Sequence, residues 1–341
     1  MKFRSGVAIA GLLVGAWAAP LRAQNGTGAL DPQCAGGSST FQDVCQKATD
    51  LYRQLAPQLG AVVAGGNATL GQGTPLGLGR WTVGLRFHVI DGSVPDLSQF
   101  PADTGAAKRT RFPLQEIPLP LPMVDGAVGV LPSLPFAGFS VGGLDALVNV
   151  AYLPNVARGG VTVRVPNGPL KLGYGARLGI FDAPGPWPAL SATWIRRDLP
   201  VVHAAAAFAA NSDRVEVEGL RARTTAWRLV ASSSFGPLQL DAGGGQDRAS
   251  SEMNLYVAIQ PPRCTYGPQS CSGRPFDGFA QKVTRSQLFA DASVDMRWAT
   301  LTFEVGRVGA IAIPTFNEFV GGSAGDASWE GALGIRVGTG R

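Results

Sequence analysis

The chain has 341 residues, of which 16% are charged, and its 29 basic and 24 acidic residues give a net charge of +5. Three of the basic residues lie in the first 23 positions, so the rest is nearly neutral, with 26 basic residues against 24 acidic ones. Nucleic-acid binding uses a clustered basic face, and we expect no nucleic-acid partner. The run AKRTR at 107–111 is interpreted as a solvated loop, which could alternatively touch an anionic partner such as lipid headgroups.

Residues 1–23 have the pattern of a secretory signal peptide. Lys2 and Arg4 precede the apolar run GVAIAGLLVGAWAA, and LRA follows it, which predicts cleavage after Ala23. No other segment reaches the roughly 18 consecutive apolar residues of a membrane-spanning helix. We therefore expect an exported chain whose mature part has no transmembrane helix.

Residues 24–60 are expected to form a separate N-terminal helical segment. In STFQDVCQKATDLYRQLAPQL, Ser39 or Thr40 can cap a helix and Pro57 lies near its end. Four apolar residues recur at helical spacing: Val44, Ala48, Leu51 and Leu55. This pattern predicts one amphipathic helix near 41–57, followed by a flexible linker, AGGNATLGQG.

The four cysteines fall into two close pairs. An exported chain meets an oxidising compartment, so two local disulfides are expected, Cys34 with Cys45 and Cys264 with Cys271. Four cysteines permit three connectivities, and this pairing depends on proximity alone. A zinc site is the alternative, but the two histidines are not near either cysteine pair, so we expect no metal and no other cofactor.

From about residue 60 glycine is frequent and the apolar residues alternate with period two. The stretch GRWTVGLRFHVI at 79–90 places Trp81, Val83, Leu85, Phe87 and Val89 on one parity and polar or glycine residues on the other. The stretches KLGYGARLGI, SQLFADASVDMRW and WEGALGIRV repeat the pattern. Each predicts a strand with one apolar face and one face of charges and glycine.

Such strands can belong to a soluble β-sandwich or to a membrane barrel. Long and short connections alternate along this chain, as they do between the extracellular loops and periplasmic turns of outer-membrane barrels. The ten predicted strands are 79–90, 121–131, 139–152, 170–181, 188–198, 224–235, 238–248, 286–298, 300–310 and 327–338. The stretches VTVRV, RVEVEGLRA and NLYVAIQ could lengthen hairpins or add pairs, which leaves twelve or fourteen strands open.

We therefore predict an all-β fold, a transmembrane antiparallel up-and-down barrel over residues 61–341. Aromatic residues at the predicted periplasmic strand ends, Trp81, Trp187, Phe235 and Trp298, suit an interfacial girdle. The apolar parity would face outer-membrane lipid. The opposite parity predicts the residues that line the lumen and any solute pathway: Arg80, Arg86, His88, Asp125, Asp145, Lys171, Arg177, Arg228, Asp241, Asp291, Asp295, Arg297, Glu304, Glu330 and Arg336.

Three runs carry a resemblance to a known family: GGLDALVNVAYLP, PNGPLKLGYGARLGIFDAPGPWPALSATWIRRDLP and WRLVASSSFGPLQLDAGGGQ. With them, residues 50–250 resemble an uncharacterised family of bacterial outer-membrane β-barrels. They are more distantly similar to the fatty-acid and hydrocarbon channels, which carry an N-terminal plug. The resemblance implies a fold and no catalytic residues. Barrels of this kind usually finish on an aromatic residue that the barrel-assembly machinery reads, whereas this chain finishes RVGTGR.

The histidines decide whether an enzyme is expected. Hydrolases of the outer membrane place a His beside Ser or Asp on the barrel. Here His88 is expected among lumen arginines, where a hydrogen-bond network is the simpler interpretation, and His203 is expected in a loop. We therefore expect no enzymatic activity.

Two classes of function agree with these patterns. The first is a narrow channel or transporter for a small apolar or amphipathic solute, gated by the N-terminal helix. The second is a non-conducting barrel that anchors loops or stabilises the envelope. A soluble periplasmic β-sandwich is the remaining alternative. The expected location is the bacterial outer membrane, with lipid and the assembly machinery as partners.

Overall fold

The computed structural model describes residues 25–36, 41–96, 105–158, 161–182, 187–208, 213–258 and 274–339. The predicted signal peptide and the second cysteine pair lie outside them. Two helices, α1 (Pro32–Ala35) and α2 (Gln42–Ala64), precede the strands. Ten strands form a ring: β1 (Trp81–Pro95), β2 (Arg111–Phe136), β3 (Phe139–Tyr152), β6 (Leu170–Asp182), β7 (Ala189–Asp198), β9 (Asp213–Phe235), β10 (Leu238–Ala258), β11 (Arg274–Asp295), β12 (Thr300–Val308) and β14 (Ser328–Gly338).

The ring is closed and antiparallel throughout. Each of its strands pairs with the next one along the chain, and β14 returns to pair with β1, from Thr82 opposite Gly338 to Ile90 opposite Glu330. Closure leaves no strand edge unpaired in the ring, which a sheet in lipid requires. The predicted up-and-down barrel is confirmed, and its ring in the described part of the chain has ten strands rather than twelve or fourteen.

Within the described residues, four short strands lie off this ring. β8 (Val202–Phe208) pairs with β9 and is followed outward by β5 (Val161–Arg164) and β4 (Val156–Arg158). β13 (Glu318–Val320) pairs in parallel with the start of β2. Residues 161–164 of the stretch VTVRV thus form part of this outer flange, whereas RVEVEGLRA lengthens β9 and the described residues 254–258 of NLYVAIQ lengthen β10.

The outer surface of the barrel is apolar, as the alternation predicts. On β1, Leu85 is 59% exposed and Phe87 is 53% exposed, whereas Arg86 between them is 1% exposed. The same alternation runs along β12, whose residues are buried and exposed in strict turn. Trp81, Trp187, Phe235 and Trp298 are all exposed. A closed barrel with a continuous apolar exterior is a lipid-facing, transmembrane barrel.

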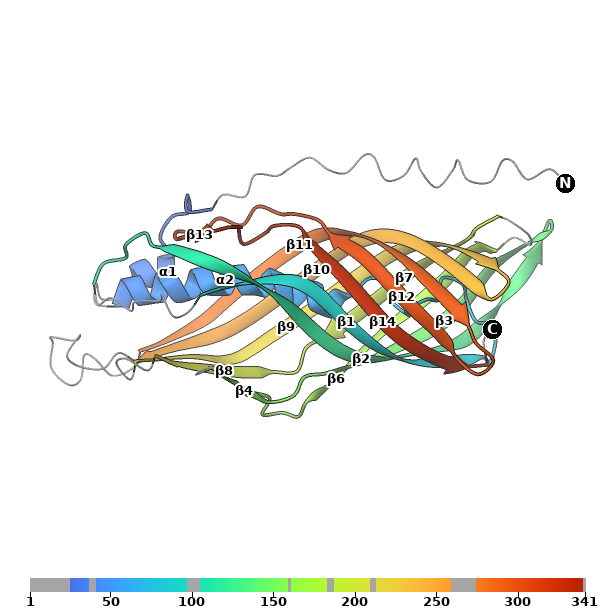
Figure 1. The fold of residues 1–341 in the computed structure, drawn as a ribbon, viewed down its shortest axis with the longest axis horizontal. Coiled ribbons are helices and arrows are strands. Elements are labelled where there is room, and N and C mark those ends of the chain that lie inside the picture. Colours follow the sequence, from blue (N-terminus) through green and yellow to red (C-terminus); the bar gives the residue numbers. More distant parts are fainter. Residues whose placement is uncertain are drawn as a thin grey trace.

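The apolar exterior ends before the longest strands do. A set of exposed charged residues, here called the charged ring, lies on the outer face of five strands: Asp91, Arg223, Arg248, Lys282 and Arg307. Charges on the lipid side cost several kcal/mol at the membrane centre. The charged ring therefore marks one edge of the lipid-facing band, the part of the barrel that lies in the membrane. Beyond it β1, β2, β9, β10 and β11 continue as an extension, at the left of Figure 1, whereas the C-terminal end lies at the right.

Helix α2 lies inside that extension (Figure 1). Its first four turns pack Val44, Ala48, Tyr52 and Ala56 against apolar residues of β10 and β11, including Met253. Its last turn packs against β1 and β2. Because the wall surrounds the helix, polar residues of α2 are buried as well. None of the helices in the described part of the chain is long and apolar enough to cross a membrane.

Two details of the predicted helix are wrong. The helix continues through Pro57 to Ala64, because proline removes only one helical hydrogen bond and the enclosing wall packs against the following turns. The predicted apolar stripe includes Leu51 and Leu55, but these are only partly buried, and Tyr52 and Ala56 take their places in the packed cluster.

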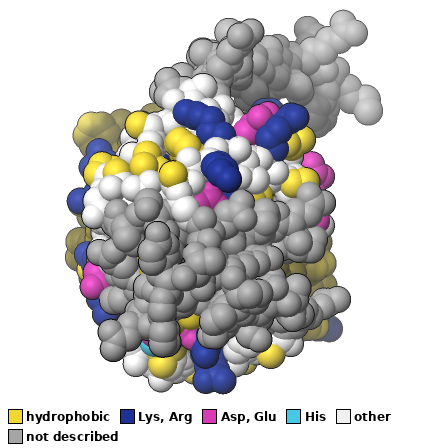
Figure 2. Space-filling model, turned by 90° about the vertical axis from the view of Figure 1, so that its left-hand side faces the viewer, with side chains coloured by type: hydrophobic (Ala, Val, Ile, Leu, Met, Phe, Trp, Pro, Cys, Tyr) yellow, Lys and Arg dark blue, Asp and Glu magenta, His cyan; other side chains and the backbone are white. Residues whose placement is uncertain are grey.

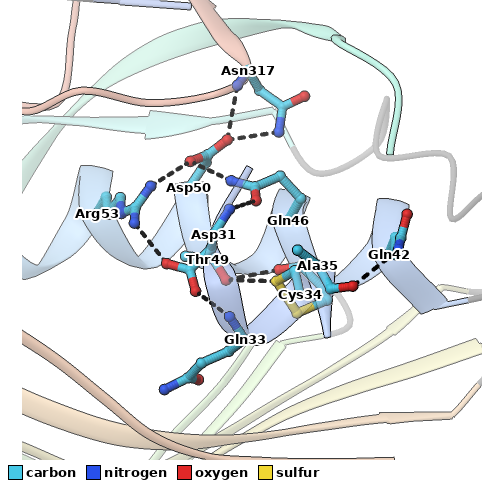
Figure 3. Close-up of a disulfide and its surroundings, with 11 residues drawn as sticks. Asp31, Gln33, Cys34, Ala35, Gln42, Gln46, Thr49, Asp50, Arg53 and Asn317 are labelled. Carbon is cyan, nitrogen blue, oxygen red and sulfur yellow. Dashed lines mark hydrogen bonds and ion pairs between the residues drawn. A yellow bond between two sulfur atoms is a disulfide. The ribbon is translucent and has the colours of Figure 1, made fainter. Parts of the chain in front are cut away.

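The predicted disulfide between Cys34 and Cys45 is present and ties α1 to the start of α2 (Figure 3). Around it, Arg53 contacts Asp31 at 2.7 Å, and Asp31 N–H donates to Gln46. Asp50 accepts hydrogen bonds from Asn317 N–H at 2.8 Å and from its side-chain amide at 2.7 Å. Burial raises the pKa of Asp50, although these hydrogen bonds act in the opposite direction.

The run AKRTR is more than a solvated loop. Arg109 donates to the carbonyls of Gly28 and Phe316 and lies 4.6 Å above the Phe316 ring. It thereby joins the N-terminal segment to the connection between β12 and β14. Figure 2 views this end of the barrel, where basic, acidic and hydrophobic side chains lie side by side in the upper part of the face.

Candidate functional site: the plugged lumen

Residues 65–76 run through the lumen inside the lipid-facing band, and we call them the plug. The structure corrects the expectation of a flexible linker here, because every residue from 65 to 73 is buried. Gly65 ends α2 at φ +59°, a conformation that L side chains rarely adopt, and its N–H donates to Ala61. The chain leaves the lumen at Leu78 and enters β1.

Four fully buried arginines of the described wall donate to backbone carbonyl oxygens of the plug and of Ala64 just before it. Arg86, Arg177, Arg197 and Arg228 are each 1% exposed. Their acceptors are the carbonyls of Ala68 for Arg86, Gln72 for Arg177, Ala64 and Ala68 for Arg197, and Gly65 and Gly66 for Arg228. Since carbonyls carry no charge, these contacts depend on the path of the backbone rather than on particular side chains.

Wall carboxylates neutralise three of these arginines. Asp145 lies 2.7 Å from the Arg177 guanidinium, and Asp125 forms an ion pair with Arg86. Asp247 lies 2.6 Å from Arg228. Buried charges must be paired and hydrogen-bonded to be tolerated. Asp125 and Asp145 accept hydrogen bonds from Arg86 and Arg177, and these arginines keep further N–H groups for the plug.

Other carboxylates accept hydrogen bonds from the plug. Leu76 N–H donates to Asp145 at 3.0 Å, and Asn67 N–H donates to Glu304 at 2.7 Å. The Asn67 side-chain amide donates to Asp291, also at 2.7 Å. The wall therefore binds both kinds of backbone group of the plug. Its arginines contact carbonyl oxygens, and its carboxylates contact N–H groups.

Glycine gives the plug the small cross-section that the lumen requires. A Cβ atom added at Gly66 would collide with the Glu304 carboxylate. One added at Gly73 would lie 2.7 Å from Ser232 Cβ, well inside normal contact. The glycines that suggested a linker are therefore sites of close packing.

The predicted lumen residues divide into three groups by burial. The buried ones are Arg86, His88, Asp125, Asp145, Arg177, Arg228, Asp241, Asp291, Glu304 and Glu330. Arg336 is partly buried and donates to Leu70 and Gly71 carbonyls of the plug. The exposed ones lie at or near strand ends, beyond the reach of the plug: Arg80, Lys171, Asp295 and Arg297.

Sequence reasoning missed two charged residues that complete the site. Arg197 donates to the carbonyls of Ala64 at the end of α2 and of Ala68 in the plug, and Asp247 neutralises Arg228. Both lie inside strands that the sequence predicts, and each shares the parity of an inward residue, Ser191 and Asp241 respectively. A stricter count of parity would have found them.

The two histidines lie in different surroundings. His88 is fully buried, with its Nδ1 atom 3.1 Å from the Val62 carbonyl and its Nε2 atom 3.3 Å from Glu330. His203 is exposed on β8, outside the ring, where it pairs in register with Arg164. The loop expected around His203 is thus a short strand.

The sequence matches no protein-family model, and no curated protein matches it in sequence. Among solved structures, the β-domain of the Bordetella autotransporter BrkA is similar with a TM-score of 0.34 and 10% identity, over 76% of this chain and 98% of that one. The toluene transporter TodX of Pseudomonas putida is similar with a TM-score of 0.30 and 11% identity, over 79% and 90% of the two chains.

Proposed function

We propose that this chain is an outer-membrane channel or transporter for small apolar or amphipathic solutes, described here in its closed state with the plug as its gate. The observation that carries the proposal is the kind of contact that closes the lumen. Backbone carbonyls and guanidinium groups meet there, and both are well solvated when water replaces the partner. The plug can therefore leave the lumen while exposing little apolar surface.

The plug and the helix differ in this respect. The buried apolar side chains of the plug are Ala68, Leu70 and Leu76, whereas α2 buries a larger cluster that includes Val44 and Tyr52. The disulfide and Asp50 further fix the start of α2. Motion of residues 65–76 with α2 held in place is therefore the less costly way to open the barrel.

A groove of about 390 Å³ beside α2 suits an amphipathic solute. Ile311, Ile313 and Val283 give it apolar walls, and Lys282 of the charged ring lies at its side. A solute with an acidic head and an apolar tail would meet both kinds of group there. The groove lies at the level where the lipid band ends, at which such a solute concentrates.

Gate motion is tested by locking the plug with Gly73→Cys and Ser232→Cys, whose Cβ atoms would be close enough for a disulfide after a small shift of the plug. Uptake of toluene and of octanoate is measured in proteoliposomes. We expect the oxidised double variant to take up neither probe and its reduced form to recover. The single variants and the unaltered chain, oxidised in the same way, are the controls.

Equal uptake by the oxidised and reduced double variant would overturn the gate. The non-conducting anchor predicts a different result, because it requires no path even without the plug. A variant that lacks residues 25–76 separates the two classes. Single-channel current through this variant in planar bilayers supports a channel, whereas a folded but silent barrel supports the anchor.

A further inference from the structure

His88, Glu304 and Glu330 converge on one point of the lumen wall. His88 on β1, Ala332 on β14 and Glu304 on β12 lie in one row across three paired strands. Glu330 precedes Ala332 by two residues and so faces the same way. The small Ala332 side chain leaves the three longer ones room to meet, and Gly306 opposite Glu330 leaves room for that carboxylate.

Each of the three side chains has a buried atom without a hydrogen-bond partner. These atoms are His88 Nε2, Glu304 Oε1 and Glu330 Oε2. The three residues are 0%, 0% and 4% exposed, and one ligand atom from each lies within 4.8 Å of the others. His88 Nε2 and Glu330 Oε2 lie 3.3 Å apart. Two ligand atoms of a tetrahedral zinc ion at the usual bond lengths are about 3.4 Å apart, so the two distances agree.

The second polar atom of each side chain is held in place. His88 Nδ1 lies 3.1 Å from the Val62 carbonyl, which can only accept a hydrogen bond, so in the neutral ring Nδ1 carries the proton and Nε2 is the atom that can bind a metal. Asn67 N–H donates to Glu304 Oε2 at 2.7 Å, and the Gln287 amide donates to Glu330 Oε1. Metal ligands are typically oriented by outer partners of this kind.

The local charge favours a cation. Arg86, Arg177 and Arg228 are each paired with an aspartate, whereas Glu304 and Glu330 have no arginine or lysine partner within 4.0 Å among the described residues. Arg86 and Arg197 act on Glu304 only at longer range. The Val62 carbonyl belongs to the last turn of α2, whose dipole also presents negative charge.

From this arrangement we propose that His88, Glu304 and Glu330 bind one divalent metal ion, with zinc as the best match to a nitrogen and oxygen set. A dication neutralises both carboxylates, which a proton on His88 does not. Sequence spacing does not indicate this site, because Glu304 and Glu330 follow His88 by 216 and 242 residues and none of the three is a cysteine. The ion would join β1, β14 and β12 beside the end of α2.

The proposal is tested with metal alone, on the full chain in detergent after treatment with a chelator. Titration with Co²⁺ is expected to give the visible absorption of a tetrahedral ion at one ion per chain, and Zn²⁺ is expected to displace it. The isosteric variants Glu304→Gln and Glu330→Gln are expected to bind Zn²⁺ at least ~100-fold more weakly. Asp241→Asn, which alters a buried lumen carboxylate outside the site, is the matched control.

Folding of each variant is checked by the change in gel mobility on heating. Absence of the Co²⁺ spectrum in the unaltered chain would overturn the proposal without reference to any variant. Equal Zn²⁺ affinity in Glu330→Gln, Glu304→Gln and the unaltered chain would overturn it as well. Either result would mean that these three side chains do not form a metal site.

Discussion

At the scale of single residues, several lumen side chains bind another wall residue and the plug at the same time. Asp145 pairs with Arg177 and also accepts Leu76 N–H, while Arg177 donates to the Gln72 carbonyl. Removing one member of such a set leaves the others buried and uncompensated. The cost of a single substitution therefore exceeds the value of the contact it removes.

Asp145→Ala tests this coupling. The variant leaves the Arg177 guanidinium buried without its counter-ion, so we expect a loss of about 3–5 kcal/mol in the free energy of unfolding. Urea unfolding in lipid vesicles measures it. The double variant Asp145→Ala with Arg177→Met is expected to regain at least half of the loss, and a double variant as unstable as the single one would contradict the explanation.

Leu178→Arg tests the outer face. Leu178 is 49% exposed on the apolar exterior, where an arginine in the lipid costs about 2–4 kcal/mol. We expect impaired assembly, measured as the fraction that migrates as a folded barrel on an unheated gel. Glu116→Arg is the control, because Glu116 is exposed on the extension of β2. Equal assembly of both variants would refute the assignment of the lipid face.

The alternation that predicts the outer face says little about the packing of the inner one. From parity alone Gly179→Ser is expected to be harmless, yet a Cβ at Gly179 would collide with the Gly142 carbonyl and would lie 2.7 Å from Pro75 Cγ. Pro75 belongs to the plug, far away in sequence. Parity shows which way a residue points, whereas what it meets there depends on the folded chain.

At the scale of elements, the strands were predictable and the plug was not. A strand in lipid must alternate along its length, so each stretch such as 79–90 carries its own signal. The segment AGGNATLGQG has the local composition of a linker, and its burial comes from arginines on β1, β6, β7 and β9. Nothing within ten residues of sequence records those partners.

The disulfide provides a test at this scale. It closes a loop with a sequence separation of 11 residues, for which chain entropy gives about 2–3 kcal/mol. Cys34→Ser with Cys45→Ser is expected to lower the hydrogen-exchange protection of the first turns of α2 by that amount. The amides of β12 serve as the internal control. Unchanged protection in α2 would mean that packing against β10 and β11 alone holds the helix.

At the scale of the whole molecule, the closed ring does not depend on the short strands that lie outside it. β4, β5 and β8 pair outward from β9 and contribute nothing to closure, whereas the β1 to β14 seam is indispensable to it. The stretch VTVRV, which contains β5, carries a strand signal like those of the ring, which explains why sequence alone left the number of ring strands open. Only the pairing partners of β9 separate the two kinds of strand.

Deletion of residues 156–164 tests this separation. Asn155 Oδ1 already accepts a hydrogen bond from Val165 N–H at 2.7 Å, so a direct join requires little rearrangement. We expect the shortened chain to form a heat-modifiable barrel at the normal yield. Deletion of residues 330–338, which removes most of β14, is the contrasting variant and should abolish it. If the variant without residues 156–164 failed to form a barrel, the outer flange would be needed for the ring to close.

The path of the plug restricts the order in which this molecule can be built. The chain enters one mouth of the lumen as α2 and leaves by the other at Leu78, so the ring encircles its own backbone along the full length of the band. The disulfide between Cys34 and Cys45 links α1 and α2 into one bulky unit at the N-terminal end of this segment. Such a unit could not pass through the lumen of a completed ring. In the full chain we therefore expect the sheet to form around the plug and the β1 to β14 seam to pair last.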